Sequence, residues 1–169
     1  MEGEAEGDLS GISIDLSDDG DIVAIGATRN NDVNGKKDSG HVRIYNYNGT
    51  SWNNVGGDLD GARVNDKFGM SVSLSSNGSI VAIGGDVGSD MAGSSGHVRI
   101  YRFNGASWDR LGSDLNDVAR DGRFGRSVDI SSDGTIVAIG APGEAFNGTS
   151  GGRVRVFERP PDPTVVRMM

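Results

Sequence analysis

Three segments of the chain repeat one pattern of apolar and polar positions. FGRSVDISSDGTIVAIGAP (124–142) matches FGMSVSLSSNGSIVAIGGD (68–86), and GISIDLSDDGDIVAIGAT (11–28) repeats the pattern without the initial Phe. In each segment, apolar residues first alternate with small polar ones, which predicts a strand buried on one face. A nearly continuous β-branched run follows, as in Ile80 to Ile83, and predicts a strand buried on both faces. The Asp-Gly or Asn-Gly between the two runs predicts a hairpin, because glycine adopts the positive φ that such turns require.

A second repeated segment follows each of these. GHVRIYNYNGTSWNNVGGDL (40–59) recurs as GHVRIYRFNGASWDRLGSDL (96–115), and GGRVRVFERP (151–160) begins a third version without the Ser-Trp part. The alternation from His97 to Tyr101 predicts a third strand, and the segment around Trp108 predicts a short fourth strand. The repeat length is about 56 residues, and no segment has the apolar spacing of an amphipathic helix.

Four short antiparallel strands in each repeat predict an all-β protein made of β-propeller blades, which protect their sheet edges by radial repetition. The alternative is a linear β-solenoid, whose coils are typically shorter than this repeat and need no Asn-Gly hairpins. The predicted organisation is an acidic N-terminal segment at 1–10 that is a candidate closing strand, blade-like repeats at 11–59, 60–115 and 116–158, the last one incomplete, and a Pro-rich tail at 159–169.

The same pattern predicts the core. Trp52 and Trp108 follow an Asn-Gly turn in each complete repeat and are expected to pack between blades, with sugar stacking as the alternative. His41 and His97 occupy equivalent strand positions and are expected on the surface, too far apart to bind one zinc ion. The strand residues expected to be largely buried are Ile14, Leu16, Val23, Ile25, Val72, Leu74, Val81, Ile83, Val128, Ile130, Val137 and Ile139.

The pairs Phe68-Gly69 and Phe124-Gly125, together with Gly140-Ala141-Pro142, resemble the FG-GAP repeat of integrin-α-like β-propellers. The resemblance covers nearly the whole chain, apart from the acidic first residues and the tail. Two copies depart from the full pattern, because the first lacks the FG pair and reads Gly26-Ala27-Thr28, and the second reads Gly84-Gly85-Asp86. The resemblance implies a β-propeller, an extracellular or cell-surface location, and a role in adhesion or protein recognition.

Calcium follows from the same resemblance, because many FG-GAP repeats bind it in a loop of Asp and Asn between the first two strands. Asp15-Leu-Ser17-Asp-Asp19-Gly20 and Asp129-Ile-Ser131-Ser-Asp133-Gly134 match the opening of such a loop. Calcium takes about six to eight oxygen ligands, whereas apolar residues follow both segments, and the second repeat has Ser73 and Asn77 instead of the acids. We therefore expect hairpin turns and no cofactor. The weaker alternative is calcium bound by Asp15, Asp19, Asp129 and Asp133.

The connections between the second and third strands differ most between repeats. TRNNDVNGKKDSG (28–40), DVGSDMAGSSG (86–96) and PGEAFNGTSGG (142–152) are rich in Gly, Ser and Asn. Repeat scaffolds often place binding groups in such loops on one side of the molecule, so these are candidate recognition loops, with solvated connectors as the alternative. The candidate contact residues are Asp32, Asn34, Asp38, Asp86, Asp90 and Glu144.

Charge and composition narrow the classes of partner. The net charge of −8 and the pI near 4.6 oppose binding to nucleic acid or to an anionic membrane. No apolar run is long enough to span a membrane, and MEGEAEGDLSG lacks the features of a signal peptide. No G-x-S-x-G, H-E-x-x-H or phosphate-binding motif occurs, so we expect no enzymatic activity. Asn48, Asn77 and Asn147 begin N-glycosylation motifs, and their number is close to chance in this composition.

These observations predict a non-enzymatic β-propeller module for protein interaction, adhesion or structural assembly. Its expected partner is another protein or a second copy of the chain. The alternatives are a carbohydrate-binding, lectin-like propeller and a calcium-dependent or hydrolytic surface enzyme. GEAEGDL (3–9) matches NNVGGDL (53–59) in its Gly-Asp-Leu, so we expect the N-terminal segment to complete the third blade of another chain, unless the chain is part of a longer propeller.

Overall fold

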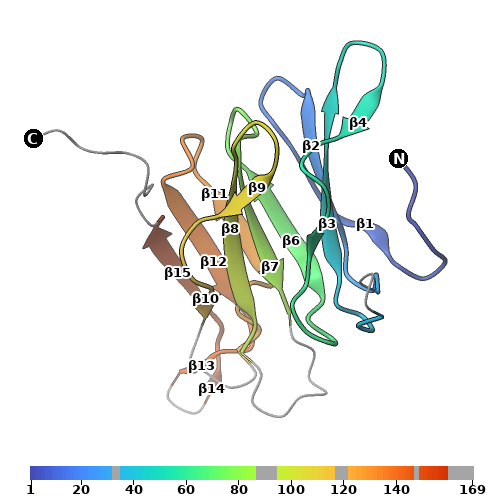
Figure 1. The fold of residues 1–169 in the computed structure, drawn as a ribbon. Coiled ribbons are helices and arrows are strands. Elements are labelled where there is room, and N and C mark those ends of the chain that lie inside the picture. Colours follow the sequence, from blue (N-terminus) through green and yellow to red (C-terminus); the bar gives the residue numbers. More distant parts are fainter. Residues whose placement is uncertain (32–34, 87–94, 117–121, 147–148, 160–169) are drawn as a thin grey trace, which may run out of the picture.

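The computed structural model describes residues 1–31, 35–86, 95–116, 122–146 and 149–159, whose main strands form three antiparallel sheets side by side in a fan (Figure 1). Blade 1 contains β1 (Ser10–Leu16), β2 (Ile22–Ala27), β3 (His41–Tyr47) and β4 (Trp52–Asn54), with β5 (Leu59–Asp60) beside β3. Blade 2 contains β6 (Phe68–Leu74), β7 (Ile80–Gly85), β8 (His97–Phe103), β9 (Trp108–Arg110) and β10 (Leu115–Asn116). Blade 3 contains β11 (Ser127–Ile130), β12 (Ile136–Ala141) and β15 (Arg153–Glu158), and a separate hairpin pairs β13 (Ala145–Phe146) with β14 (Thr149–Ser150). The described residues contain no helix, so the predicted all-β fold is confirmed.

The predicted hairpin between the first two strands of each blade is also confirmed. Gly20, Gly78 and Gly134 end the three turns with φ values of 76°, 65° and 71°. A serine hydroxyl closes each turn by accepting a hydrogen bond from the first residue of the next strand, as Ser75 Oγ does from Ile80 N at 3.0 Å. The repeated Ser-x-x-Gly therefore encodes both the turn and the start of the second strand.

Cross-strand register divides each blade into two faces. In blade 2, Val72, Ile83 and Arg99 lie opposite one another on three neighbouring strands. They belong to the front face, which we define as the face toward the preceding blade. Ala82 and Ile100 lie opposite one another on the back face, which we define as the face toward the following blade. Equivalent residues occupy the equivalent faces of blades 1 and 3.

Two apolar clusters fill the junctions between the blades. One joins the back face of blade 1 to the front face of blade 2 around Phe68, and the other joins blade 2 to blade 3 around Phe124. Both phenylalanine side chains are fully buried. The predicted core residues that are buried as expected are Val23, Val72, Leu74, Val81, Ile83, Ile130, Val137 and Ile139.

The core prediction is wrong for Ile14 and Leu16, whose side chains are 66% and 53% exposed. Both lie on the front face of blade 1, where no described sheet packs, whereas the equivalent Val72 and Leu74 are covered by blade 1. Ile25 and Val128, also expected in the core, are half-buried. The alternating pattern thus identifies the apolar face of a strand, but a neighbouring blade is needed to bury that face.

The first strands of neighbouring blades contact one another, β1 with β6 and β6 with β11, and carry polar bonds between blades. Ser13 Oγ donates to the carbonyl oxygen of Gly69 at 2.7 Å, which ties blade 1 to blade 2. The equivalent Ser71 Oγ donates to the carbonyl oxygen of Gly125 at 2.8 Å, which ties blade 2 to blade 3. The two junctions therefore repeat one another in their hydrogen bonds as well as in their apolar contacts.

The N-terminal segment Met1–Leu9 contains no strand in this structure. Leu9 and Lys67 each have a left-handed backbone, with φ values of 58° and 47°, and each directly precedes the first strand of a blade. The N-terminal segment therefore lies where the linker lies before blade 2, and not where a fourth strand lies. Glu4 within it pairs with Arg43 of the same chain's blade 1. Completion of another chain's blade by this segment stays a prediction.

Candidate interaction surfaces

The described parts of the predicted recognition loops lie at one end of the blades, where Figure 1 shows the described residues between β2 and β3 and the strands β13 and β14 along the lower edge. Asp38 has a left-handed backbone, and its amide donates to Asn31 Oδ1 at 3.0 Å. Asp86 lies 3.8 Å from Arg126 in an ion pair across the junction of blades 2 and 3. The candidates that lie outside the described residues are Asp32, Asn34 and Asp90.

Glu144, the remaining loop candidate, is buried inside its own blade. One of its oxygens accepts hydrogen bonds from Arg153 at 2.7 Å and from Arg155 at 3.2 Å. A carboxylate held in this way stabilises the blade and offers little to an external partner. Asp38, Asp86 and Glu144 belong to three different blades, and the structure does not bring them together into one site.

The carboxylates of the calcium alternative are engaged in hydrogen bonds within the chain. In the turn of blade 1, Asp19 accepts bonds from Ser17 Oγ and from a backbone amide, which lower the pKa of Asp19. In the turn of blade 3, bonds from Ser131 and Thr135 lower the pKa of Asp133 to about 2. Both acids cap their turns, a common role of Asp in this position.

The other two acids of that alternative act across blade junctions. Asp15 Oδ2 accepts a hydrogen bond from Leu74 N at 2.7 Å, and Asp129 Oδ1 accepts one from Ser73 Oγ at 3.3 Å. Within the described residues, neither acid belongs to a group of converging metal-ligating side chains. Calcium at these four positions would compete with the turns and junctions that they hold, and calorimetric titration would test it.

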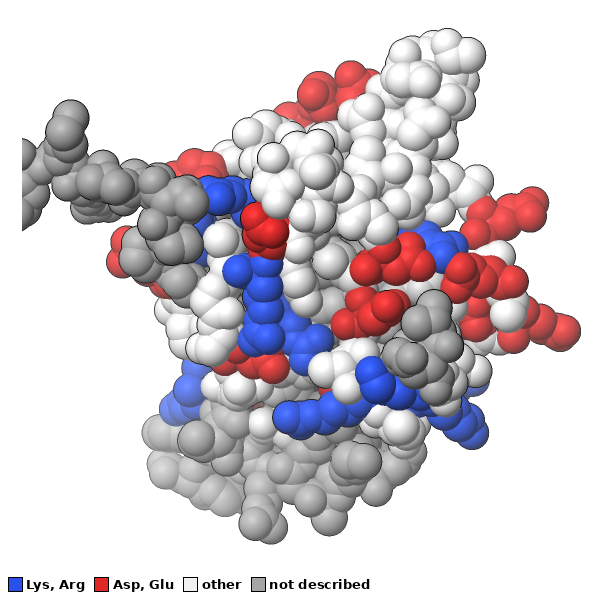
Figure 2. Space-filling view, in the orientation of Figure 1, with Lys and Arg blue, Asp and Glu red and all other residues white. Residues whose placement is uncertain are grey.

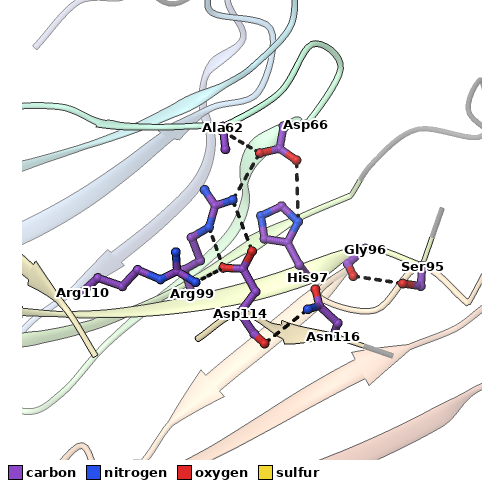
Figure 3. Close-up of polar contacts among 9 residues, drawn as sticks. All are labelled: Ala62, Asp66, Ser95, Gly96, His97, Arg99, Arg110, Asp114 and Asn116. Carbon is purple, nitrogen blue, oxygen red and sulfur yellow. Dashed lines mark hydrogen bonds and ion pairs between the residues drawn. The ribbon is translucent and has the colours of Figure 1, made fainter. Parts of the chain in front are cut away.

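A charged cluster lies buried at the junction between blades 1 and 2 (Figure 3). Arg99 on β8 donates from Nε to Asp114 Oδ1 at 2.8 Å and lies 3.7 Å from Asp66, in the linker before β6. His97 Nδ1 also lies 3.7 Å from Asp66, and its ring stacks on Phe68 with 5.8 Å between centroids. The Arg99 guanidinium lies 5.0 Å from the centre of the same Phe68 ring. The cluster therefore connects the linker, β8 and the segment before β10.

Burial and ion pairing determine the pKa values, and so the charges, of the side chains in this cluster. Burial is the largest single effect and alone would lower the pKa of Arg99 and raise that of Asp114, but their hydrogen bond and the opposite charges nearby together outweigh burial in both. The pKa of Arg99 therefore lies above its usual value and that of Asp114 below it. Burial lowers the pKa of His97, and the charge of Asp66 offsets only part of this effect. His97 is thus neutral at pH 7, and its Nε2 atom is buried without a hydrogen-bond partner.

Blade 1 carries an equivalent cluster of Glu4, His41, Arg43 and Asp58. The ligand atoms of Glu4, His41 and Asp58 lie within 4.8 Å of one another, the one such metal-ligating group among the described residues. Arg43 donates to Asp58 at 2.7 Å and pairs with Glu4, and its hydrogen bonds lower the pKa of both carboxyls. Because one guanidinium pairs with both acids, a metal ion bound by them would have to displace Arg43. The arrangement is therefore best explained as a structural ion-pair cluster.

The expectation of surface histidines is wrong, since His41 and His97 are only 4% and 5% exposed. Both lie on front faces, where His97 is covered by Phe68 and His41 lines a small pocket together with Met1–Gly3. Sequence reasoning also missed the ion pairs around Arg43 and Arg99. Their signal is present, because His-Val-Arg recurs in two repeats and an Asp follows each arginine by 15 residues.

The tryptophans differ between blades. Trp108 is buried between blades 1 and 2, where its Nε1 donates to the carbonyl oxygen of Val55 at 3.0 Å, so the expected packing is confirmed. Trp52 holds the equivalent position on the front face of blade 1 and is half-buried, with its ring 5.3 Å from that of Tyr47. No described blade covers it.

Two apolar faces are exposed at the ends of the fan. The front face of blade 1 carries Ile14 and Leu16, and the back face of blade 3 carries Val154 and Val156, which are 70% and 66% exposed. Figure 2 shows Asp and Glu gathered at the right of the view, on the side of blade 1 and the N-terminal segment. Exposed apolar faces mark sites of protein interaction.

Comparison with known proteins identifies part of the chain. Residues 115–157 match the family model of the FG-GAP repeat, a span that runs from β10 into β15 and covers blade 3. No curated protein matches the chain significantly. FG-GAP repeats form β-propeller-type modules that generally bind proteins, and they are typically extracellular and non-enzymatic. The described residues include no helix of the length and apolarity needed to cross a membrane. The resemblance read from the sequence is therefore confirmed over residues 115–157, where the third blade is similar to an FG-GAP repeat.

Proposed function

We propose that the chain is a non-enzymatic module for protein interaction and assembly that binds through the front face of blade 1 and the back face of blade 3. One observation carries the proposal. Apolar positions that are buried or half-buried at both internal junctions are exposed at the two ends, as Ile14 and Leu16 are on blade 1 and Val154 and Val156 on blade 3. Removing such area from water is the main favourable term in protein association.

Other surfaces support this role less well. In the described loops, Glu144 is committed to two arginines of its own blade and Asp86 to Arg126. The ion pairs around Arg43 and Arg99 are internal to the fold. The exposed apolar faces have no packing partner among the described residues. Their burial against a partner would therefore contribute free energy of binding.

We place this module outside the cell or on its surface, as is typical of FG-GAP repeats. Asn48 and Asn77 begin glycosylation motifs and are exposed at hairpin turns, where a glycan would not disturb the blades. Surface labelling of intact producing cells with a membrane-impermeant reagent tests this location. Labelling only after lysis would contradict it.

Carbohydrate binding is the second candidate, and Trp52 favours it. Its half-buried ring beside Tyr47 offers an aromatic surface, whereas Trp108 is covered by blade 1. A glycan array with the unmodified chain and with Trp52→Ala tests this candidate. Binding that the substitution abolishes would support a lectin-like role.

A photo-reactive amino acid placed at the position of Ile14 or Val154 tests the main proposal. We expect each probe to form a protein adduct in extracts of cells that produce the chain. The control probe replaces Val64, which is 43% exposed and lies outside both faces. Failure of both face probes to give adducts above this control would overturn the proposal.

A further inference from the structure

We propose that the back face of blade 3 docks on the front face of blade 1 of a second copy of the chain, and that two copies close into one ring. This inference rests on the proposed function, because it names the partner of the same two faces. The template is the junction that the chain already forms twice, between blades 1 and 2 and between blades 2 and 3.

The apolar halves of the new junction are both present. At the first internal junction, Val42 and Ile44 of the back face are fully buried in the cluster that contains Val72 and Leu74. Cross-strand register places Val154 and Val156 at the equivalent back-face positions of blade 3. The equivalent front-face positions of blade 1 are those of Ile14 and Leu16. Each end of the chain therefore exposes one half of a junction that is buried elsewhere in the same molecule.

The serine–carbonyl hydrogen bonds between blades also form a series along the chain, and this series predicts a further bond at the proposed junction. Ser13 donates to the carbonyl oxygen of Gly69, and Ser71 donates to that of Gly125. The next donor in the series is Ser127, and the equivalent acceptor on blade 1 is the carbonyl oxygen of Gly11. Gly11 already has the left-handed backbone of the bonded glycines, with φ at 90° against 89° for Gly69 and 87° for Gly125. Blade 1 is thus shaped to accept a serine from a preceding blade.

Gly140 supplies an independent argument. A Cβ at Gly26 or Gly84 would lie 2.2 or 2.1 Å from the carbonyl oxygen of the next blade, so these close approaches require glycine. Gly140 holds the same position in blade 3 and has no left-handed backbone to explain it. A Cβ there would meet only the hydroxyl of its own Ser127 within 3 Å. The glycine keeps room for a carbonyl that the described part of this chain does not provide.

The turns make an isoleucine–glycine contact at each internal junction, and each of the two ends carries one half of that contact. Ile22 of blade 1 packs over Gly78 of blade 2, and Ile80 packs over Gly134 of blade 3. The next isoleucine in the series, Ile136, is 40% exposed, and a Cβ at Gly20 of blade 1 would meet nothing within 4 Å. Docking would place Ile136 of one copy over Gly20 of the next.

Ring closure limits the number of copies. Propellers typically have about four to eight blades. Two copies supply six blades, whereas three copies would supply nine. Among rings built from whole copies of these three blades, the dimer falls within this range, with two identical head-to-tail junctions related by a twofold axis.

Engineered cysteines test the junction directly, because the chain has none of its own. Ile136→Cys and Gly20→Cys, prepared as separate variants and mixed, are expected to give a disulfide-linked dimer under mild oxidation. Each variant alone is expected to stay uncrosslinked, since the junction pairs unlike residues. Ile22→Cys with Gly78→Cys is the matched control, because it sets the same pair, with the same strained turn position, at an internal junction and should crosslink within one chain. A control that crosslinks while the mixed variants do not would overturn the proposal, and so would dimers of either single variant.

Light scattering gives the second readout. The unmodified chain is expected at twice its mass of 17.6 kDa, and Val154→Glu with Val156→Glu is expected to give a folded monomer with an unchanged far-ultraviolet CD spectrum. Val64→Glu, which adds a charge outside both faces, is expected to leave the dimer intact. An unmodified monomer would overturn the second copy as partner, and assemblies that grow with concentration would overturn the closed ring. If the probes at Ile14 and Val154 still capture a different protein from a monomeric chain, the proposed function stands while this inference fails.

Discussion

Arg99 Nε lies 2.8 Å from Asp114 Oδ1, and the Arg99 side chain is only 7% exposed. A charge this deep depends on its partner, because removal of one member of a buried pair leaves the other uncompensated.

Asp114→Asn is therefore expected to lower the free energy of unfolding by about 2 kcal/mol, which urea unfolding measures. The loss is smaller than for a fully buried pair because Asp114 is 24% exposed. Asp58→Asn is the matched control in blade 1, where Arg43 is more exposed and keeps its close pair with Glu4, whereas Arg99 keeps the carboxylate of Asp66 at the longer distance of 3.7 Å. It should cost less than about 1 kcal/mol. Equal losses for the two variants would show that burial at the junction does not strengthen the pair.

The loss of stability on truncating an apolar strand residue to Ala is expected to depend on whether a neighbouring blade covers that residue, and not on its position within the repeat. Ile83 is fully buried between blades 1 and 2, so Ile83→Ala should cost about 3 kcal/mol in the free energy of unfolding. Ile14→Ala, on the equivalent front face of blade 1, should cost less than about 1 kcal/mol, because Ile14 is already 66% exposed. Urea unfolding of dilute protein compares the two. A large loss at Ile14 in a monomer would mean that residues outside the described ranges cover this face.

The repeat pattern was sufficient to predict the strands because each feature acts locally. Alternation fixes the apolar face of β6, and Gly78 with its positive φ fixes the turn before β7. The FG pair also recurs with one structural role, because Phe68 and Phe124 both fill the junction at the start of a front face. These features recur in the sequence, so they could be recognised without the structure.

Contacts between blades could not be predicted in the same way. Leu16 and Leu74 have the same pattern around them, yet one is 53% exposed and the other is buried, because only Leu74 has a blade in front of it. His97 resembles a surface strand residue until Phe68 and Asp66, from another part of the chain, are brought against it. Burial at a junction depends on which faces meet, and this information is not contained in a single repeat.

Two glycines at equivalent positions are expected to respond differently to alanine. In Gly84→Ala, the new Cβ would lie 2.1 Å from the carbonyl oxygen of Gly125, which is backbone and cannot easily move. We expect a loss of about 2 kcal/mol or more in the free energy of unfolding. In Gly140→Ala, the close neighbour is the Ser127 hydroxyl, which can rotate away, so the loss should be below about 1 kcal/mol. Thermal unfolding at concentrations too low for association separates the two variants, and similar losses would contradict this account of the junction.

The buried histidines should make the fold less stable as the pH falls from about 7 to 5. Burial lowers the pKa of His97, and burial together with the charge of Arg43 lowers that of His41, whereas the unfolded chain keeps the usual value near 6.5. Above that pH both states are neutral at these positions and no dependence arises. Below it the unfolded chain binds protons that the folded chain does not, so the free energy of unfolding falls by at most about 1.4 kcal/mol per pH unit for each histidine.

Urea midpoints at several pH values measure this slope. Asp66, Asp114 and Arg99 face His97, and the pKa of Asp114 lies below its usual value despite burial, because of its pairing with Arg99, so the slope in this window is assigned to the histidines. The chain has only two, so His97→Gln should remove one part of the slope and His41→Gln the rest. A slope that survives in the double variant would mean that another group takes up the proton, and a flat profile in the unmodified chain would mean that water reaches His97.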